Sequence, residues 1–560
     1  MFLSFVERLY RQIFTQLQGL QWKDGGPVIA AQFDNEYSGR GEYLMALKKI
    51  ALKIGFDLPF YTRTGWPELA TPVPFGEMLP LYGDYADGFW ERSIEETAGN
   101  YYKAFNFTPP SSSPERGENM GAMDAVSALD TVRHSSPLGR SGGVPYFTCE
   151  LGGGMMTAYH RRPYIYPEDA YSMAVVKLGS GSNLLGYYMY HGGTNPEGLT
   201  YLNETQRTVA TNYNDLPVKT YDFQAPLNEF GQKNPHYYLL RKLHLFMQDW
   251  GEVLAPMKAS FPCQQNIAKG DDGFLRWSYR AKDSSGFIFI NNYERLQNLS
   301  AKRDVKLEAC GVKFPQLTIP AGTICIFPVN IGDIKYATAQ LVAKRDGKIY
   351  LEQIKGIPTT LAIGNKVLKN LKAKGPDVPV YQNYYLLTSE QAGRLFLNEE
   401  DTSHSSLFTL DFKKVKEADA LRTIPIGVNK VAEEPVDEDF EQAAVYTIDL
   451  PENYSQITNH KSLLNIDYRG DVARLYANGK LIDDNFYNGR PFQYALWRLP
   501  KGCKQLELRI LPLQKDMPVY FPREADTTPG EQVMKVTIIS WQEPYSQPFP
   551  SFRVRQGLCR

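Results

Sequence analysis

The 560-residue sequence is poor in the residues that build metal centres and disulfide frameworks. It contains seven histidines and six cysteines, and the cysteines are scattered without a Cys-x-x-Cys pair. This spacing does not support a zinc site, and a disulfide framework is not expected in a chain of this length. We therefore expect a protein without a metal site.

The sequence also lacks an excess of charge of either sign. Lysine and arginine number 61 and aspartate and glutamate 62, which leaves a net charge of -1. This balance gives no electrostatic basis for a nucleic acid or an anionic membrane as partner. No run of about 18 apolar residues is present, so no membrane span is predicted. Residues 1–7 lack the basic start and the small-residue cleavage site of an export signal.

Aromatic residues, by contrast, are abundant. They make up 13% of the chain, with 36 tyrosines and 29 phenylalanines, and the hydrophobic fraction of 43% is enough for sizeable cores. Two explanations stay open for the aromatic content, namely aromatic-rich β-structure and stacking against sugar rings. A chain of this length has room for roughly three to four domains.

The first 252 residues alternate between strand and helix patterns. Phe5, Leu9, Ile13 and Leu17 recur at helical spacing behind a Ser4–Glu7 capping box, which predicts a helix over about 4–20. Such alternation favours a parallel sheet covered by helices. The further helices are expected from Tyr43 to Ile54 and over 167–179 and 236–250, and the strands over 27–33, 58–63, 144–149, 184–190 and 219–223. Five such strands are fewer than the eight of a closed (β/α)8 barrel.

Residues 68–143 form a long interruption rich in proline and glycine, which we interpret as an insertion near the mouth of the sheet or a partly disordered segment. After about residue 252 the pattern changes to short strands separated by turn residues. Asn478-Gly479 between two strands is a strong hairpin signal. The predicted fold is α/β, with a partial (β/α)8 TIM barrel over 1–252, a β-sandwich over 253–385 and a jelly roll over 386–560.

Glu36 follows the first apolar strand of the sheet, after Asp34 and Asn35. The carboxyl ends of barrel strands face the active site, and partial burial there favours the protonated carboxyl that a general acid needs. Asn35 is placed to hydrogen-bond a sugar hydroxyl. A structural role remains the alternative, in which Glu36 caps the next helix or pairs with Arg40.

Glu150 ends a second buried strand and is followed by three glycines at 152–154. These glycines allow either close approach of the backbone to a ligand or a plain flexible turn. Two glutamates at two strand ends are what retaining glycoside hydrolysis requires, with carboxyls about 5–5.5 Å apart. Tyr190 and Tyr221, at the ends of later strands, are candidates for sugar contact, with core packing as the alternative.

Four segments together resemble glycoside hydrolase family 35, the β-galactosidases, and most of all its bacterial branch. They are the segment from Gly25 to Tyr37, the strand that ends in Glu150, the run Met189-Tyr190-His191-Gly192-Gly193-Thr194-Asn195, and Tyr221 to Gly231. The resemblance implies that Glu36 is the proton donor, that Glu150 is the nucleophile, and that Asn35 contacts the 2-hydroxyl. It implies release of terminal non-reducing β-D-galactose from an oligo- or polysaccharide, without a cofactor.

The sequence departs from the family pattern at several points. Asp34 and Ser38 replace Glu and Gly, Phe223 replaces a sugar-contacting Tyr, and the Glu150 segment is glycine-rich where the family has tryptophan. By the resemblance the first three barrel strands are missing, so we expect a truncated and inactive chain whose intact parent is periplasmic or secreted. Another exo-β-glycosidase, or a carbohydrate-binding protein with a dead barrel, stays open as an alternative.

Overall fold

The computed structural model describes residues 1–35, 37, 39–62, 77–108, 146–197, 204–207, 215–262, 267–397, 406–451 and 462–540. They form two compact units. Unit 1 comprises residues 1–157, 163–194 and 221–393, and unit 2 comprises 158–162, 195–220 and 394–560. We predicted a domain boundary near 385, and the chain passes from unit 1 to unit 2 after residue 393. The predicted boundary at 252 stays a prediction. No local pattern indicated that two short segments of the first 252 residues join unit 2.

Parallel strands carry the N-terminal part of unit 1. β1 (Ala31–Gln32) pairs in parallel with β2 (Phe60–Thr62), and β2 pairs with β3 (Leu79–Pro80). A second parallel ladder joins β4 (Tyr82–Asp84), β5 (Thr148–Gly152) and β6 (Tyr187–Tyr188). The predicted parallel pairing is thus present in two ladders, and the strands β3 and β4, which belong to different ladders, both lie inside the segment that we had interpreted as an insertion.

One predicted strand lies outside these two ladders. The strand expected over 219–223 is β8 (Thr220–Tyr221), and among the described residues it pairs with β7 (Gly193–Thr194) rather than with β6. The sequence shows a short β-run at this place but not its partner, because pairing is decided by segments distant in the chain.

The predicted helices are all present: α1 (Phe2–Leu17), α2 (Gly41–Ile54), α4 (Pro167–Gly179) and α5 (Pro235–Leu254). The predicted start and face of α1 are wrong. The helix begins at Phe2, and Ser4 donates its hydroxyl to the Met1 carbonyl instead of forming a capping box. Its packed face is the stripe that includes Tyr10 and Phe14, because these rings fit against Phe33 and Phe56.

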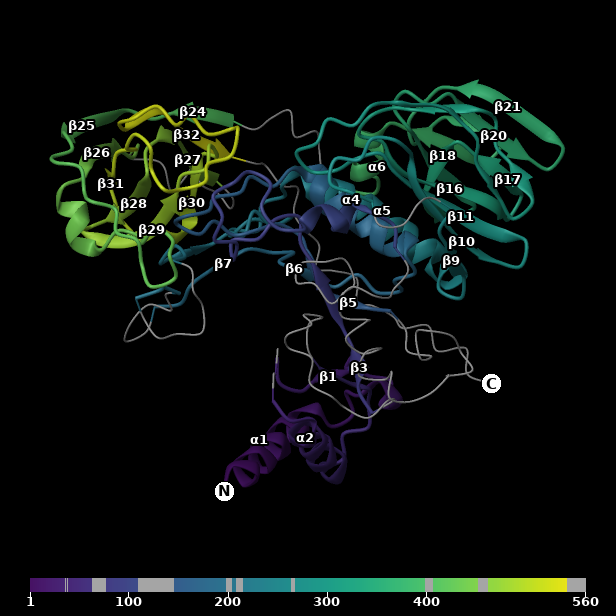
Figure 1. Cartoon of the computed structure of the whole chain (residues 1–560), viewed down its shortest axis with the longest axis horizontal. Coiled ribbons are helices and arrows are strands. Elements are labelled where there is room, and N and C mark those ends of the chain that lie inside the picture. Colours follow the sequence, from purple (N-terminus) through teal and green to yellow (C-terminus); the bar gives the residue numbers. More distant parts are fainter. Residues whose placement is uncertain are drawn as a thin grey trace. The chain divides into compact units, whose positions relative to one another are not determined.

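α4 and α5 pack together in the main core of unit 1. α4 contacts β10 (Arg276–Lys282), β11 (Ser285–Asn291) and β16 (Ile324–Ile331). Figure 1 shows α4 beside α5. The core between them holds Leu178, Leu243, Phe246 and Phe287, all of which are buried. Within the parts of the chain that the structure describes, no helix combines the length and the apolar character needed to cross a bilayer.

The rest of unit 1 is β-structure. An antiparallel sheet runs in the order β21 (Lys366–Leu371), β20 (Thr359–Ile363), β17 (Ile334–Ala337), β16, β11, β10 and β9 (Lys258–Ser260). A second sheet runs in the order β18 (Ala339–Arg345), β19 (Lys348–Gln353), β23 (Tyr384–Leu387) and β22 (Pro379–Tyr381). Smaller ladders join β12 (Lys302–Val305) to β15 (Leu317–Ile319) and β13 (Glu308–Ala309) to β14 (Val312–Lys313), and α6 (Ser389–Arg394) follows β23.

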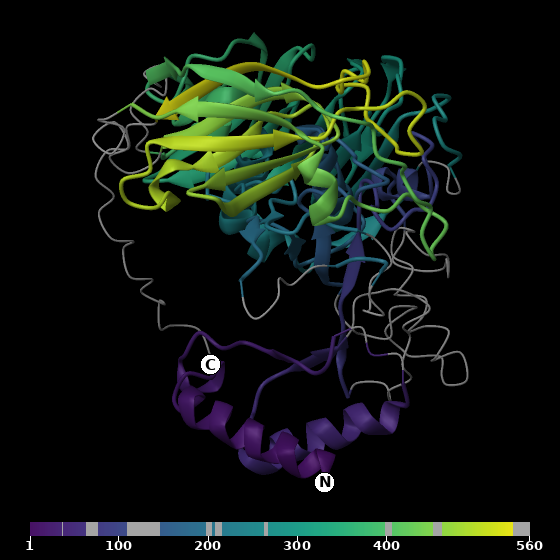
Figure 2. The same ribbon diagram turned by 90° about the vertical axis from the view of Figure 1, so that its left-hand side faces the viewer.

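Unit 2 is built from two antiparallel sheets, whose strands run alongside one another in green to yellow in Figure 2. One has the order β25 (Phe412–Lys416), β26 (Ala444–Asp449), β31 (Gln505–Ile510), β28 (Val472–Ala477) and β29 (Lys480–Phe486). The other has the order β24 (Ser406–Thr409), β32 (Gln532–Ser540), β27 (Ser462–Arg469) and β30 (Phe492–Ala495).

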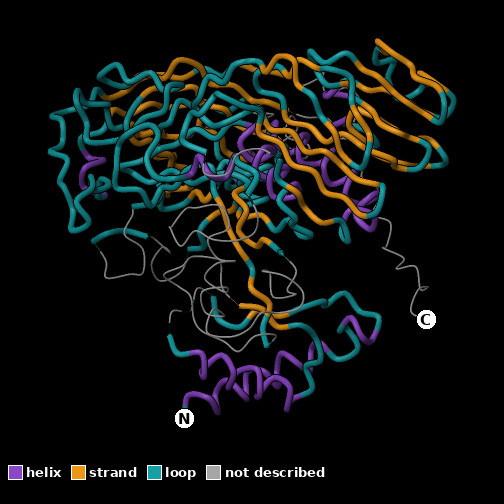
Figure 3. The backbone as a smooth tube through the Cα atoms, turned by 45° about the vertical axis from the view of Figure 1, so that its right-hand side comes forward, coloured by secondary structure: helices purple, strands orange, loops and turns teal. Residues whose placement is uncertain are grey.

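The predicted hairpin in unit 2 is confirmed. Asn478 and Gly479 connect β28 to β29, and both have positive φ, 51° and 75°. Positive φ at both central residues is the requirement of the tight hairpin turn that Asn-Gly signals. Figure 3 shows that strands and loops make up most of the molecule and helices a minority, in line with the predicted change from mixed α/β to β-structure.

Candidate active site

Glu150 lies on β5, between the parallel neighbours β4 and β6. In register it stands opposite Gly83 of β4, and the next residue, Leu151, stands opposite Tyr187 of β6. The Glu150 side chain is half-buried. One carboxylate oxygen, Oε2, accepts a hydrogen bond of 2.8 Å from the hydroxyl of Tyr85. This bond fixes the orientation of the carboxylate.

Tyr85 follows β4 directly and is only 2% exposed. Its ring lies beside that of Trp90, with ring centroids 5.0 Å apart, and Trp90 is itself half-buried. A Cβ at Gly152 would meet the Tyr85 ring at 2.9 Å, so the glycine leaves room for it. Both aromatic residues were missed from the sequence, because they lie in the segment 68–143. The local signal at this place was the short apolar run at 78–82, which Pro80 interrupts.

The glycines after Glu150 have a role that was not considered from the sequence. A Cβ at Gly153 would lie 2.1 Å from the carbonyl oxygen of Met189, and one at Gly154 would lie 2.1 Å from that of Phe223. Both contacts are shorter than any real Cβ tolerates. The glycines therefore allow the strand ends of β5, β6 and β8 to pass in contact with one another.

Tyr221 lies next to Tyr188, a residue that was not predicted from the sequence. Their hydroxyl oxygens are 3.0 Å apart, and both side chains are half-buried. Phe223 packs edge-on against Tyr188 at 5.3 Å and beside Tyr221 at 5.7 Å, and it is 1% exposed. The residue that replaces a family tyrosine thus packs against both members of the tyrosine pair.

Tyr190 packs against α5. Its ring lies 5.8 Å from that of His244 and 6.4 Å from that of Tyr237, both on α5, and 5.4 Å from Tyr187 on β6. The hydroxyl oxygen of Tyr187 is 2.9 Å from Nε2 of His244. These are packing contacts between a strand and a helix. Sugar contact by Tyr190 stays a prediction.

Asn35 is exposed at the loop after β1, where its Oδ1 accepts a hydrogen bond of 2.9 Å from Gln32. Glu36 lies outside the described residues. The distance between the two predicted catalytic carboxyls is therefore still a prediction from the sequence, as is the sugar contact of Asn35.

The chemistry open to the site depends on which donor and acceptor groups it brings together. In the described ranges, no group of three or more His, Cys, Asp or Glu side chains converges so as to hold a metal ion. What the described residues of the site offer is an oriented carboxylate beside aromatic side chains, and such a carboxylate is able to act as an acid, a base or a nucleophile.

The known proteins that this chain resembles point to one family. Residues 1–247 match the model of glycosyl hydrolases family 35. "Beta-galactosidase-1-like protein 3" of Mus musculus is 24% identical over 264 residues, which cover 47% of this chain and 33% of that protein. "Beta-galactosidase" of Bos taurus is 26% identical over 247 residues, which cover 43% of this chain and 31% of that protein. The chain thus spans about one third of the curated relatives that it matches.

Among solved structures, a Bacteroides uniformis beta-glucuronidase 2 covalently bound to an aziridine inhibitor aligns over 95% of this chain and 55% of that chain. The identity is 10% and the TM-score 0.24. Values this low do not establish a common fold.

Proposed function

Residues 1–247 belong to glycosyl hydrolases family 35, and from this premise we propose that the protein is a retaining exo-glycoside hydrolase that releases terminal non-reducing β-D-galactose. The observation that carries the proposal is the Glu150 carboxylate, half-buried on a parallel strand and held at one oxygen by Tyr85. The proposed substrate is an oligo- or polysaccharide, and for an intact parent protein we propose hydrolysis in the periplasm or outside the cell.

In the proposed mechanism Glu150 is the nucleophile. One of its oxygens attacks the anomeric carbon while Glu36 protonates the departing glycosidic oxygen, which gives a covalent glycosyl-enzyme. Glu36 then takes a proton from water, and this water displaces Glu150 with net retention at the anomeric carbon. Asn35 and Tyr221 are the proposed contacts of the sugar hydroxyls.

Tyr85 has a defined part in these steps. Its hydrogen bond keeps the Glu150 carboxylate in one orientation, so that little reorganisation is needed before attack.

The test is chemical rescue of two carboxyl-deleted variants with azide, using an activated aryl β-galactoside. Glu150→Ala should lose turnover by at least about 10³-fold and, with azide, form the α-galactosyl azide, because azide replaces the nucleophile in one inverting step. Glu36→Ala should form the β-galactosyl azide, because azide then attacks the glycosyl-enzyme.

Glu168→Gln, a change at an exposed glutamate in the first turn of α4, is the control and should keep full activity. Wild-type enzyme that turns over no aryl galactoside but hydrolyses another aryl β-glycoside would change the sugar and keep the mechanism. A chain that binds galactosides without hydrolysing any glycoside would contradict the proposed enzyme activity, and it would agree with the expectation of an inactive truncated chain or of a carbohydrate-binding protein.

A further inference from the structure

Two short stretches from the N-terminal part of the chain are folded into unit 2. Residues 158–162 and 195–220 cluster with residues 394–560, while the chain on either side of each stretch belongs to unit 1. The second stretch ends at Thr220, one peptide bond before Tyr221. The β-structure of unit 2 therefore holds the backbone that leads directly into the candidate site.

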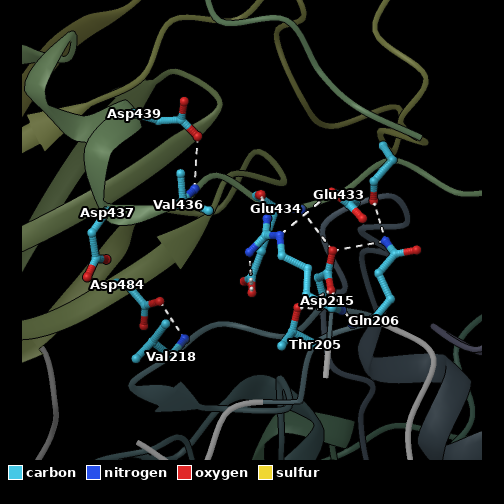
Figure 4. Close-up of polar contacts among 12 residues, drawn as sticks. Thr205, Gln206, Asp215, Val218, Glu433, Glu434, Val436, Asp437, Asp439 and Asp484 are labelled. Carbon is cyan, nitrogen blue, oxygen red and sulfur yellow. Dashed lines mark hydrogen bonds and ion pairs between the residues drawn. The ribbon is translucent and has the colours of Figure 1, made fainter. Parts of the chain in front are cut away.

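Asp484 makes the contacts that hold this backbone. It lies on β29 and is 1% exposed. Its Oδ2 accepts a hydrogen bond of 2.6 Å from the N–H of Val218, and its Oδ1 accepts bonds of 2.7 and 3.2 Å from the N–H groups of Lys219 and Thr220. Figure 4 shows the Asp484–Val218 contact. One buried carboxylate thus fixes three consecutive backbone amides.

Asp215 holds the start of residues 215–220, the last part of the same stretch. Its Oδ1 accepts hydrogen bonds of 2.7 Å from the Thr205 hydroxyl and from the Gln206 N–H. Its Oδ2 accepts bonds from the Gln206 side chain, 3.0 Å, and from the Glu434 N–H, 2.8 Å (Figure 4). Residues 215–220 are all buried. The six residues before Tyr221 are therefore fixed at both ends by carboxylates of unit 2.

A buried carboxylate is costly unless its oxygens are satisfied by hydrogen bonds. Burial raises the pKa of Asp484, and the bonds from Lys219, Val218 and Thr220 act against this rise. A neutral hydrogen-bonding side chain at this position would have a smaller free-energy cost of desolvation than a carboxylate. The charge is useful here because only a carboxylate presents acceptors, and no donor, to all three N–H groups.

We propose that Asp484 is a positioning residue for the galactosidase site, acting through Tyr221. It fixes the backbone at 218–220, and the next residue then carries its hydroxyl to within 3.0 Å of that of Tyr188. Misplacement of a substrate-contacting group by about 1 Å can cost about 100-fold in rate. This inference rests on the proposed function, since it deepens the role of Tyr221 in that site.

The experiment combines Asp484→Asn with Tyr221→Phe in a double-mutant cycle on the full chain. The introduced amide turns an NH₂ group toward one of the three backbone N–H groups and so breaks at least one of the hydrogen bonds from residues 218–220 to Asp484. We expect kcat/KM for an aryl β-galactoside to fall about 10- to 100-fold in Asp484→Asn. In the Tyr221→Phe background the same change should cost less than about 3-fold, because the two residues act as one unit.

Glu531→Gln is the matched control. Glu531 is another largely buried carboxylate of unit 2, bonded to Lys414 and Tyr446 and not to the 218–220 backbone. Its loss of kcat/KM should be small, and unchanged by Tyr221→Phe. Equal losses for Asp484→Asn with and without the Tyr221 change, or an equal loss in Glu531→Gln at matched thermal stability, would overturn the positioning role.

Amide hydrogen exchange gives a readout that needs no turnover. In Asp484→Asn the amides of Val218, Lys219 and Thr220 should exchange at least about 10-fold faster, and that of Tyr221 should follow, while the strands of unit 2 keep their protection. Unchanged exchange at these four amides would overturn the inference even in an active enzyme. A wild-type chain without glycosidase turnover would instead contradict the proposed function. The exchange result would then test only whether Asp484 holds the backbone at 218–220.

Discussion

At the scale of single residues, the bond from Tyr85 to Glu150 is the feature most directly tied to the proposed chemistry. Tyr85→Phe removes one hydroxyl and keeps the ring beside Trp90. We expect kcat to fall about 10- to 100-fold with a smaller change in KM, because a bond to a charged group is worth about 1.5–3 kcal/mol and orients the proposed nucleophile. Steady-state kinetics on an aryl β-galactoside measure both constants.

Tyr101→Phe is the matched control for this change. The Tyr101 hydroxyl bonds to Glu91 at 3.0 Å, in the same region of the chain. Its removal should leave kcat close to the wild-type value. A Tyr85→Phe variant with unaltered kcat would show that Glu150 needs no such support.

His244 supplies a pH dependence of stability. Burial, and secondarily the charge of Arg241, lowers the pKa of His244 from 6.5 to about 4. Between pH 6.5 and 4 the imidazole of His244 is therefore protonated in the unfolded chain but neutral in the folded chain. The free energy of unfolding therefore decreases as the pH falls through this window. The loss approaches about 3 kcal/mol at most. Urea unfolding across this pH range should show it in the wild type, whereas His244→Gln, which cannot titrate, should flatten that part of the profile.

At the scale of elements, Arg280 of β10 connects the ends of two helices. It is 1% exposed, and its guanidinium donates to the carbonyls of Leu178 at the end of α4 and of Leu254 at the end of α5. It also donates to the carbonyls of Ser182, Ala255 and Met257 and to the side chain of Asn183. The carbonyl ends of helices carry partial negative charge, so a buried cation is stabilised there without a carboxylate partner.

Arg280→Met should destabilise unit 1 by about 3–5 kcal/mol, because it leaves several buried carbonyls without donors. Urea unfolding followed by tryptophan fluorescence measures this, and Arg280→Lys should recover part of the loss. Lys282→Met, at an exposed position of the same strand, should cost less than about 0.5 kcal/mol. A loss below about 1 kcal/mol in Arg280→Met would mean that the helix ends are satisfied without the arginine.

At the scale of the whole molecule, unit 2 contains pieces of chain that are far apart in sequence. Arg162 and Asp471 form a fully buried ion pair of 2.6 Å between residues 158–162 and the body of unit 2. Tyr159 donates its hydroxyl to the other oxygen of Asp471 at 2.8 Å. Residues 394–560 alone would leave Asp471 buried without these partners.

Arg162→Met should therefore lower the free energy of unfolding of unit 2 by about 3–5 kcal/mol, because it leaves a buried carboxylate without its cationic partner. The double variant Arg162→Met with Asp471→Asn should recover part of this stability in urea unfolding. Lys480→Met breaks an exposed ion pair to Glu197 of the second stretch and should cost far less, because water screens that pair. If Arg162→Met were no worse than Lys480→Met, the short stretch would not be needed for the stability of unit 2.

Local pattern determined much of the molecule. The 167–179 helix was predicted at its observed bounds, because a proline start and regular apolar spacing are local signals. The same kind of signal found the Asn478-Gly479 hairpin. It placed Glu150 at the end of a strand over 144–149, whereas Glu150 lies in the middle of β5 (Thr148–Gly152). The strands β3 and β4 were missed because Pro80 and Gly83 interrupt their apolar run, and the face of α1 was missed because either of two adjacent stripes of that helix is apolar.

By itself, then, the sequence determined the presence of four helices, the order of α/β and β-rich parts, the resemblance to glycosyl hydrolases family 35 and the strand that carries Glu150, since each of these is carried by neighbouring residues. Only the tertiary structure decided that Tyr85, 65 residues away, holds that carboxylate, and that Asp484, 264 residues from Thr220, holds the backbone before Tyr221. Such contacts depend on how distant strands are brought together, and no local spacing of residue types records that arrangement.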